Sequence, residues 1–447
     1  MSQKDSGNRN FSGKPNEVRI MTLNPGHFHA ALVQKNMLEQ VDPTVYIYGP
    51  DGPDLEQHIE RIEGFNSREE SPTDWKMVVY RGDDYLERMI REKSGNVMVT
   101  AGNNRDKTEY IKKAVDNGIN VLSDKPMVID KEGWELLVEA FESAEKNGVL
   151  LYDIMTERNE ITSMIQRHLA HTPELFGELK KGSPEDPSIV KESVHHLFKS
   201  VAGTPLRRPA WYFDVSQQGE GVVDVTTHLV DLTMWGAFPD RVIDHEKDVE
   251  MLKASRWPTV MSKEQFKEVT GESDFPGFLK DQLVDGELPY YCNGDMVFTI
   301  NGYHSRISVI WDYKAPEGGN DTHFSMMRGT QVDLVIRQGE EQNYKPTLYV
   351  ELVEGANRSN VEKALVTTIN ELRKDYPGIE IDGVDNGWKL EIPDKFYKGH
   401  EAHFGKVAQD YFGYLASGKL PDWEVPNMIT KYYITSQARE LAMKGDD

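Results

Sequence analysis

Short apolar runs and helical stretches alternate through the first 155 residues of the chain. The runs are rich in β-branched and aromatic residues, and they occupy residues 18–23, 45–48, 76–80, 96–101, 119–122 and 149–154. Regular alternation of strand and helix predicts a parallel sheet with helices on both faces. We therefore expect an α/β domain with a doubly wound, mostly parallel sheet over residues 17–155.

The pattern changes after residue 155. Residues 241–395 hold a series of strand patterns linked by glycine-containing segments, which is typical of antiparallel sheets. A helical stretch at 359–373 interrupts the series, and two further helices follow at about residues 400–443. We predict an α+β domain over residues 156–447 with a large, mainly antiparallel open sheet.

Composition excludes several classes of protein. The 447 residues carry 51 basic and 74 acidic side chains, and the net charge of −23 disfavours nucleic acid and anionic membrane surfaces as partners. No run approaches the roughly 20 apolar residues of a membrane span. Cys292 is the single cysteine, which excludes an internal disulfide and a cysteine-based zinc site.

Residues 1–16 are polar and predict a flexible leader. No signal peptide is recognised in them. We expect a cytoplasmic protein by default, or a periplasmic one if this leader follows a removed export signal.

The first strand leads directly into a turn, where a dinucleotide-binding Rossmann fold places its glycine-rich loop. Only Gly26 of the three glycines is present, with Asn24 and His29 in the first and third positions. Asparagine tolerates positive φ, so the tight turn is feasible. We predict that Asn24, Gly26, His27 and Phe28 contact a dinucleotide, whose diphosphate lies at the start of the following helix.

His27 and His29 also form a His-x-His pair. No Asp, Glu or Cys accompanies them at the helical spacing of a zinc site. We therefore expect no metal here and interpret His27 as part of the wall of the cofactor or substrate site.

Two more strand ends carry polar residues suited to a dinucleotide. Asp51 lies just beyond the second strand, where an acidic residue binds the ribose hydroxyls, although a simple turn aspartate is the alternative. No Arg or Lys stands beside it in the sequence, which favours NAD over NADP. Gly102, Asn103 and Asn104 follow the fourth strand, where small and amide residues allow the nicotinamide-side ribose to approach closely.

The fifth strand ends in Asp124, Lys125 and Pro126. Proline disfavours the helical region for the residue before it, so Lys125 is expected to be extended at the carboxyl end of the strand. Open α/β sheets bind their ligands at this end. A surface turn is the alternative interpretation.

Asp224 and His228 are the most specific pair in the second half of the chain. Their i, i+4 spacing would place them on one face of a helix that begins after a glycine-containing loop. Trp211 and Tyr212 lie shortly before them. The alternative is that Asp224 and His228 only cap and brace the helix.

This ordered set resembles the Gfo/Idh/MocA family of NAD(P)-dependent sugar oxidoreductases. The family has Glu-Lys-Pro where this chain has Asp124-Lys125-Pro126, and then an Arg/Trp loop and Gly-Gly-x-x-x-Asp-x-x-x-His. The resemblance implies that Lys125, Asp224 and His228 are the catalytic set, with His228 as the acid/base.

The resemblance also implies that Asn104, Asp124 and Arg158 lie against the cofactor. Lys107 stands where relatives have a histidine, a departure in the same part of the cofactor site. Relatives pair subunits through the open sheet and pack their terminal helices on the first domain. We therefore expect a homo-oligomer, a dimer or tetramer, in which helices at about 400–443 pack back on the first domain.

Oxidation of a carbinol requires that a hydride leave carbon and that a proton leave oxygen. A cation at Lys125 would stabilise the developing alkoxide, and His228 would accept the proton near neutral pH. The expected substrate-binding residues provide aromatic faces and hydrogen-bond donors for a sugar: Lys199, Arg208, Trp211 and Tyr212.

We therefore expect an NAD-dependent dehydrogenase of a sugar or glycoside, with NADP less favoured. One alternative is a glycosidase that uses bound NAD transiently through oxidation, elimination, hydration and reduction. The other is a non-catalytic carbohydrate-binding protein that has lost its cofactor. Net NADH production, cleavage of an aryl glycoside without NADH, and failure to bind NAD distinguish the three in that order.

Overall fold

The structure is a computed structural model that describes residues 11–201 and 204–445. Most of the predicted leader, residues 1–10, lies outside the described residues. The chain divides into two compact units. The first comprises residues 1–156, 216–218 and 399–432, and the second comprises residues 157–215, 219–398 and 433–447.

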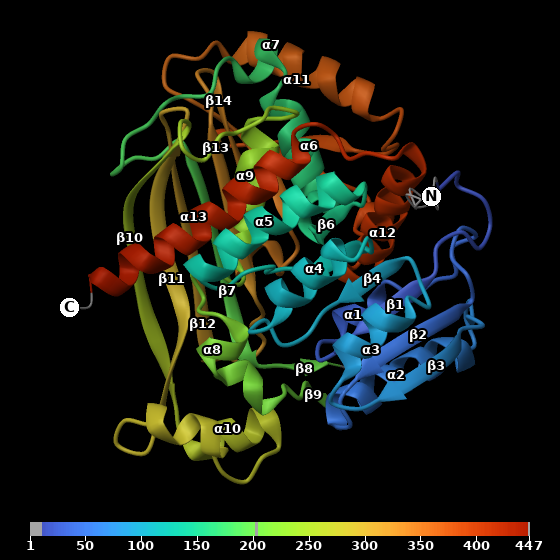
Figure 1. Ribbon diagram of the computed structural model, residues 1–447. Coiled ribbons are helices and arrows are strands. Elements are labelled where there is room, and N and C mark those ends of the chain that lie inside the picture. Colours follow the sequence, from blue (N-terminus) through green and yellow to red (C-terminus); the bar gives the residue numbers. More distant parts are fainter. Residues whose placement is uncertain (1–10, 202–203, 446–447) are drawn as a thin grey trace. The chain divides into compact units, whose positions relative to one another are not determined.

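A six-stranded parallel sheet forms the centre of the first unit (Figure 1). Its order is β3–β2–β1–β4–β5–β6. The strands are β1 (Ile20–Leu23), β2 (Thr44–Gly49), β3 (Lys76–Arg81), β4 (Val97–Thr100), β5 (Asn120–Asp124) and β6 (Leu151–Ile154). The order reverses between β1 and β4, which creates the switch point at which such sheets bind ligands. β1, β4, β5 and β6 are buried along their whole length, as parallel strands between helical layers must be.

Helices cover this sheet. They are α1 (His29–Leu32), α2 (Pro53–Ser67), α3 (Tyr85–Glu92), α4 (Lys107–Asp116), α5 (Lys131–Asn147) and α12 (His400–Ser417). α4 packs on α5, and α12 packs on α1 and β6. The Asp130 side chain caps α5 by accepting from the amide of Gly133, and Gly148 ends it in the left-handed conformation. Two helices carry residues of both units: α8 (Val215–Gln218) and α13 (Glu424–Lys444).

A nine-stranded mixed sheet forms the centre of the second unit, in the order β10–β11–β12–β7–β13–β14–β15–β17–β16. Only β12 and β7 pair in parallel. The strands are β7 (Ile189–Phe198), β10 (Val249–Met261), β11 (Leu288–Ile300), β12 (Tyr303–Lys314), β13 (Thr322–Arg328), β14 (Val332–Gln338), β15 (Thr347–Leu352), β16 (Glu380–Val384) and β17 (Gly387–Glu391). β8 (Ser200–Val201) and β9 (Thr204–Pro205) form a separate hairpin.

The α-helices that lie wholly in this unit are α6 (Ile161–Ala170), α7 (Pro173–Phe176), α9 (Thr226–Ala237), α10 (Lys263–Thr270) and α11 (Arg358–Leu372). Short 3-10 turns are η1 (Thr156–Asn159), η2 (Ala210–Phe213), η3 (Gly277–Gln282), η4 (Glu340–Gln342) and η5 (Asp394–Phe396). Ile165 of α6 and Leu365 of α11 belong to one core with Leu334 and Leu348 of the sheet. Apolar side chains at helical spacing on α6 and α11 thus meet alternating apolar side chains of the strands.

The predicted fold class is confirmed: a parallel Rossmann-type sheet is followed by a large, mainly antiparallel sheet. α2 runs for 15 residues, and Pro53 with the acidic Asp54 and Glu56 favours its first turn. α1 has only four residues. Within the described part of the chain, no helix combines the length and apolar character that a bilayer crossing requires.

Candidate functional site

The carboxyl ends of three neighbouring strands carry most of the predicted cofactor residues. Asn24 follows β1, Gly102 follows β4 and Asp124 ends β5. β1 pairs with β4, and β4 pairs with β5. These residues therefore gather at the switch point of the parallel sheet.

The turn after β1 has the tight geometry expected of it. Asn24 has a φ of 43°, a value that asparagine tolerates. A Cβ on Gly102 would lie 2.7 Å from the amide nitrogen of Gly26. Glycine is therefore required where the end of β4 packs against this turn.

The backbone of this turn offers few donors to an anion. The amides of Gly26 and His27 both donate to the carbonyl oxygen of Ala101, at 3.0 and 3.2 Å. α1 spans only four residues, so few peptide dipoles add up at its N-terminus. Side chains must therefore supply most of any contact with a diphosphate here.

Asp124 lies in a buried cluster with two histidines. Nδ1 of His29 lies 2.9 Å from Oδ2 of Asp124, and Nδ1 of His27 lies 3.7 Å from the same oxygen. Burial opposes ionisation of Asp124, but the charge and hydrogen bond of His29 and the charge of Lys107 hold its pKa well below the usual value. Burial lowers the pKa of His27 and of His29, and the charge of Asp124 opposes this effect.

The expectation of no metal rested on the sequence immediately around His27 and His29. The structure adds a carboxylate from β5, Asp124. Each of the three residues offers a potential ligand atom within 4.8 Å of the others. Asp124 on β5 thus supplies the carboxylate ligand that is absent from the sequence around His27 and His29.

Lys107 braces the turn after β5. It is 1% exposed, and its Nζ donates to the carbonyl oxygens of Asp124 and Pro126 at 3.2 and 3.1 Å. The peptide bond between Lys125 and Pro126 is cis, and Lys125 is partly exposed. The lysine that replaces the family's histidine therefore holds the backbone on both sides of Lys125.

The side-chain amides of the two asparagines predicted to contact the cofactor also have hydrogen-bond partners within the protein. Asn103 Nδ2 donates to Oε1 of Gln217 at 2.6 Å, and Asn104 Nδ2 donates to the carbonyl oxygen of Gln218 at 2.7 Å. The backbone amide of Asn104 donates to the carbonyl of Gln217 at 2.8 Å. The loop after β4 thus fixes residues 216–218.

Asp51 has a basic neighbour that the sequence did not reveal. Nη1 of Arg81, at the end of β3, lies 3.1 Å from Oδ1 of Asp51. The premise that no Arg or Lys lies beside Asp51 is therefore wrong for the folded chain. β3 pairs with β2, and this pairing brings Arg81 next to Asp51. A guanidinium at this position suits a 2′-phosphate, so the argument for NAD over NADP no longer holds.

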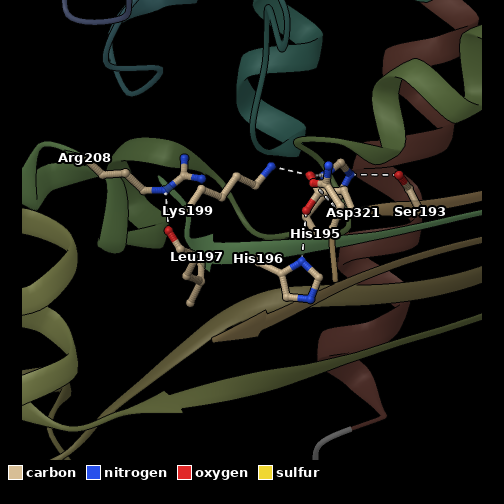
Figure 2. Close-up of polar contacts among 8 residues, drawn as sticks. Ser193, His195, His196, Leu197, Lys199, Arg208 and Asp321 are labelled. Carbon is tan, nitrogen blue, oxygen red and sulfur yellow. Dashed lines mark hydrogen bonds and ion pairs between the residues drawn. The ribbon is translucent and has the colours of Figure 1, made fainter. Parts of the chain in front are cut away.

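A second carboxylate cluster lies in the second unit, where β7 and β13 meet. Figure 2 shows His195, His196 and Lys199 turned toward Asp321. Nδ1 of His195 lies 3.2 Å from one carboxylate oxygen and Nδ1 of His196 lies 3.0 Å from the other, while Lys199 forms an ion pair. Burial opposes ionisation, but the hydrogen bond and charge of His195, with Lys199, hold the pKa of Asp321 well below its usual value.

Trp311 forms an aromatic wall beside this cluster. The rings of His195 and Trp311 stack with centroids 4.7 Å apart. The guanidinium carbon of Arg208 lies 5.2 Å from the Trp311 centroid and 4.7 Å from the Tyr212 centroid. Three of the four predicted substrate residues, Lys199, Arg208 and Tyr212, thus border one cluster, while Trp211 is half-buried on η2.

Asp224 does not lie on the same helix as His228. α9 begins at Thr226, and Asp224 lies in the preceding turn, where its carbonyl accepts from the amide of Thr227 at 3.2 Å. The predicted shared helix is therefore wrong. A Cβ on Gly221 would lie 1.8 Å from a backbone oxygen of β11, so this turn packs directly on the strand and cannot continue the helix.

The charge of Asp224 nevertheless reaches the aromatic wall. Burial raises the pKa of Tyr212, the charge of Arg208 opposes this effect and the charge of Asp224 adds to it. His228 is half-buried on the first turn of α9. The charges of Asp224 and Arg208 therefore both act on the Tyr212 hydroxyl, in opposite directions.

Arg158, predicted to contact the cofactor, has a protein partner. Its Nε and Nη2 donate to both oxygens of Asp231 on α9 at 2.7 and 2.6 Å. The pair is largely buried. This bidentate contact ties η1 to α9 and leaves a cofactor role for Arg158 as a prediction.

Sequence reasoning did not single out five residues of the second cluster: Ser193, His195, His196, Trp311 and Asp321. Ser193 Oγ lies 2.8 Å from Nε2 of His195. Ser193 and His195 are two positions apart on one strand, so their side chains lie on the same face of it. This spacing was visible in the sequence. Asp321 and Trp311 carried no such signal, because they lie on other strands or loops.

Comparisons with known proteins identify this architecture. Residues 165–443 match the family described as "Putative oxidoreductase C terminal domain". The crystal structure of a "putative oxidoreductase" from Parabacteroides merdae ATCC 43184 is 56% identical, with a TM-score of 0.96 over 98% of this chain and 100% of that chain. No curated protein matches the chain.

More distant solved structures share the fold. Levoglucosan dehydrogenase in complex with NADH and levoglucosan is 13% identical, with a TM-score of 0.59 over 96% of this chain and 97% of that one. A mutant of KijD10, a 3-ketoreductase from Actinomadura kijaniata in complex with TDP-benzene and NADP, is 12% identical, with a TM-score of 0.56 over 95% and 98%. The family match and the 56% identity show that this chain belongs to the Gfo/Idh/MocA-type oxidoreductases that carry this C-terminal domain.

Proposed function

We propose that this protein transfers a hydride between NAD or NADP and a hydroxyl-bearing carbon of a sugar or glycoside. The observation that carries the proposal is the position of Lys125 at the carboxyl end of β5, next to the switch point of the parallel sheet. Lys107 holds the backbone on both sides of it. The backbone of a partly exposed lysine is thereby held at the edge of the sheet where this fold binds its ligands.

The residues present fit a nicotinamide dinucleotide. Gly102 permits the close packing of the β1 and β4 ends that shapes the switch point. Asp51 offers an exposed carboxylate for ribose hydroxyls, and Arg81 beside it suits a 2′-phosphate. When bound, the nicotinamide supplies the hydride acceptor or donor.

In the proposed reaction the protein's own side chains accept a proton and stabilise negative charge. We assign to Lys125 the stabilisation of negative charge on the substrate oxygen as its proton leaves. His228 is assigned to accept that proton, since an imidazole titrates near neutral pH. Asp224 is assigned to orient the imidazole or a neighbouring hydroxyl.

The second cluster suits a sugar. Lys199 and Arg208 offer donors and Asp321 offers an acceptor, while the buried Trp311 and Tyr212 support His195 and Arg208 from behind. Two proteins of the same fold are described as a levoglucosan dehydrogenase and a 3-ketoreductase. Pyranosides and anhydro sugars are therefore the first substrates to test.

The test is a substrate panel with NAD and with NADP. Purified protein is incubated with glucosides, inositols and anhydro sugars while the absorbance of the reduced cofactor is followed. We expect at least one sugar to reduce one cofactor, and Lys125→Ala to abolish the signal. Failure of both cofactors to bind in calorimetry would overturn the proposal, and cleavage of an aryl glycoside without net reduction would favour the glycosidase alternative.

A further inference from the structure

Three side chains able to ligate a metal converge at the turn after β1: His27, His29 and Asp124. They come from two segments that are far apart in the sequence, one after β1 and one at the end of β5, and these two strands flank β4 in the sheet. We infer that they form a binding site for one divalent transition-metal ion of the zinc type. Two imidazole nitrogens and one carboxylate oxygen are a donor set that Zn²⁺ and its neighbours in the transition series accept.

The distances agree with this assignment. With metal–ligand bonds of about 2.0–2.2 Å in a tetrahedral site, neighbouring ligand atoms lie about 3.3–3.5 Å apart. The two Nδ1 atoms lie 2.9 and 3.7 Å from Oδ2 of Asp124, on either side of that value. The three ligand atoms all lie within 4.8 Å of one another, so side-chain adjustments alone would bring them onto one ion.

A second observation points to a ligand at the same place. Nδ1 of His27 is buried and has no hydrogen-bond partner among the described residues. At 3.7 Å, its distance to Oδ2 of Asp124 is too long for a hydrogen bond. A cation between the two atoms would give Nδ1 of His27 a partner, whereas a buried nitrogen without one is costly.

The surroundings hold the three residues in position. Nε2 of His29 lies 3.3 Å from Nε2 of His400 on α12. Metal-bound histidines usually make such a contact through the ring nitrogen that does not bind the metal. Lys107 fixes the backbone of Asp124.

The nearby ammonium groups of Lys107 and Lys125 oppose any dication. This repulsion is the same for every divalent ion. The two imidazole nitrogens are what favour the zinc type of ion over Mg²⁺, which requires oxygen ligands.

Three protein ligands leave a coordination position open for another molecule. Its assignment rests on the proposed function, in which the turn after β1 faces a dinucleotide. The amides of Gly26 and His27 are already hydrogen-bonded to Ala101, and two of the usual glycines are absent. We assign the open position to an oxygen of the cofactor's diphosphate, so that the metal replaces the missing backbone donors.

The metal site is tested without nucleotide. Full-length protein is freed of metal with a chelator, then titrated with Zn²⁺ in a calorimeter and with Co²⁺ by visible absorbance. We expect one equivalent per chain and a four-coordinate Co²⁺ spectrum. His27→Ala and Asp124→Asn should each weaken binding at least about tenfold. His27 is 28% exposed, so its replacement should leave the fold intact, which a melting curve verifies.

Two controls test specificity. His168→Ala removes an exposed histidine elsewhere, and Asp321→Asn alters the other carboxylate that contacts two histidines and a lysine. Both should bind Zn²⁺ as the wild type does. Less than stoichiometric binding by the wild type, or equal binding by His27→Ala, overturns the metal site.

The diphosphate role has a separate readout. NAD and NADP affinities are measured with and without Zn²⁺, and we expect about a tenfold gain for the wild type and none for His27→Ala. Zn²⁺ binding with unchanged cofactor affinity overturns the diphosphate assignment and retains the metal site. Absence of cofactor binding under both conditions overturns the proposed function, while the nucleotide-free titration still decides the metal site.

Discussion

Asp124 in the first unit and Asp321 in the second have the same kinds of neighbour. Each carboxylate lies close to two histidines, and each cluster includes a lysine. The lysines act differently. Lys199 pairs with the carboxylate of Asp321, whereas Lys107 donates to backbone carbonyls and leaves the carboxylate of Asp124 to imidazoles.

The difference shows that residue type alone does not define a site. The side chain of Asp321 is 21% exposed and already has a cation, so it suits exchangeable contacts with a sugar. The side chain of Asp124 is 5% exposed, and the lysine near it is used elsewhere. In the proposed metal site, a metal ion would lie beside Asp124. The corresponding position beside Asp321 is already occupied by the ammonium group of Lys199.

Replacing the two lysines gives the largest expected contrast. Lys107→Met leaves two buried carbonyl groups without their donor and should cost about 3 kcal/mol of unfolding free energy. Lys199→Met removes a half-exposed ion pair and should cost about 1 kcal/mol or less. Urea unfolding of both variants measures the difference. Equal losses would contradict the distinct roles of the two lysines.

Acid unfolding compares the two carboxylates. Both have a folded-state pKa below that of the unfolded chain, so their contribution is present above about pH 4 and is lost as the pH falls further. Asp124→Asn should cost about 2 kcal/mol at pH 7 and flatten this acid dependence. Asp321→Asn should do the same to a smaller extent. If both variants lose stability below pH 4 in parallel with the wild type, neither carboxylate stabilises the fold as described.

Arg81→Ala tests the cofactor side of the comparison. If Arg81 meets a 2′-phosphate, the variant should bind NADP about tenfold more weakly, while NAD binding changes less than about twofold. Calorimetric titration with each cofactor provides both numbers. Equal effects on the two cofactors would show that Arg81 serves only its ion pairs with Asp51 and Glu56.

The smallest expected effect is on the pH dependence of stability and involves Lys191 on β7 of the second unit. It is 3% exposed, and its Nζ contacts Ser325 Oγ at 2.7 Å. Burial lowers its pKa to about 7 from 10.5. Between these values the unfolded chain binds more protons, so stability should rise with pH by about 1 kcal/mol from pH 7 to 8. Lys191→Met should abolish that rise, and a persistent rise in the variant would assign it to another group.

The fold was readable from sequence where one local pattern determined one element. The alternating runs gave the parallel sheet, and Asn24 and Gly26 gave a tight turn with positive φ at Asn24. The contacts of Asp124 were not readable, because His29 lies 95 residues away and only the pairing of β1, β4 and β5 brings them together. Arg81 beside Asp51 required the β2–β3 register in the same way.

The second cluster was only partly readable. Lys199, Arg208 and Tyr212 lay near a recognisable motif, whereas Asp321 and Trp311 depended on the pairing of β7 with β12 and β13. Asp224 and His228 had helical spacing, but the backbone of β11 lies against Gly221, so α9 starts later than the spacing predicts. Packing between distant segments decided each of these points.

The most direct measurement of the division of roles is a side-by-side determination of kcat and KM for Lys125→Ala and His195→Ala, with a sugar that the wild type oxidises. We predict that Lys125→Ala lowers kcat by about 10²–10³ with a small change in KM, because its charge stabilises the transition state. We predict that His195→Ala raises KM for the sugar while kcat stays within about threefold, because His195 belongs to the cluster for which we propose sugar binding and not proton transfer. An unchanged kcat for Lys125→Ala, or a kcat for His195→Ala that falls as far, would contradict this division.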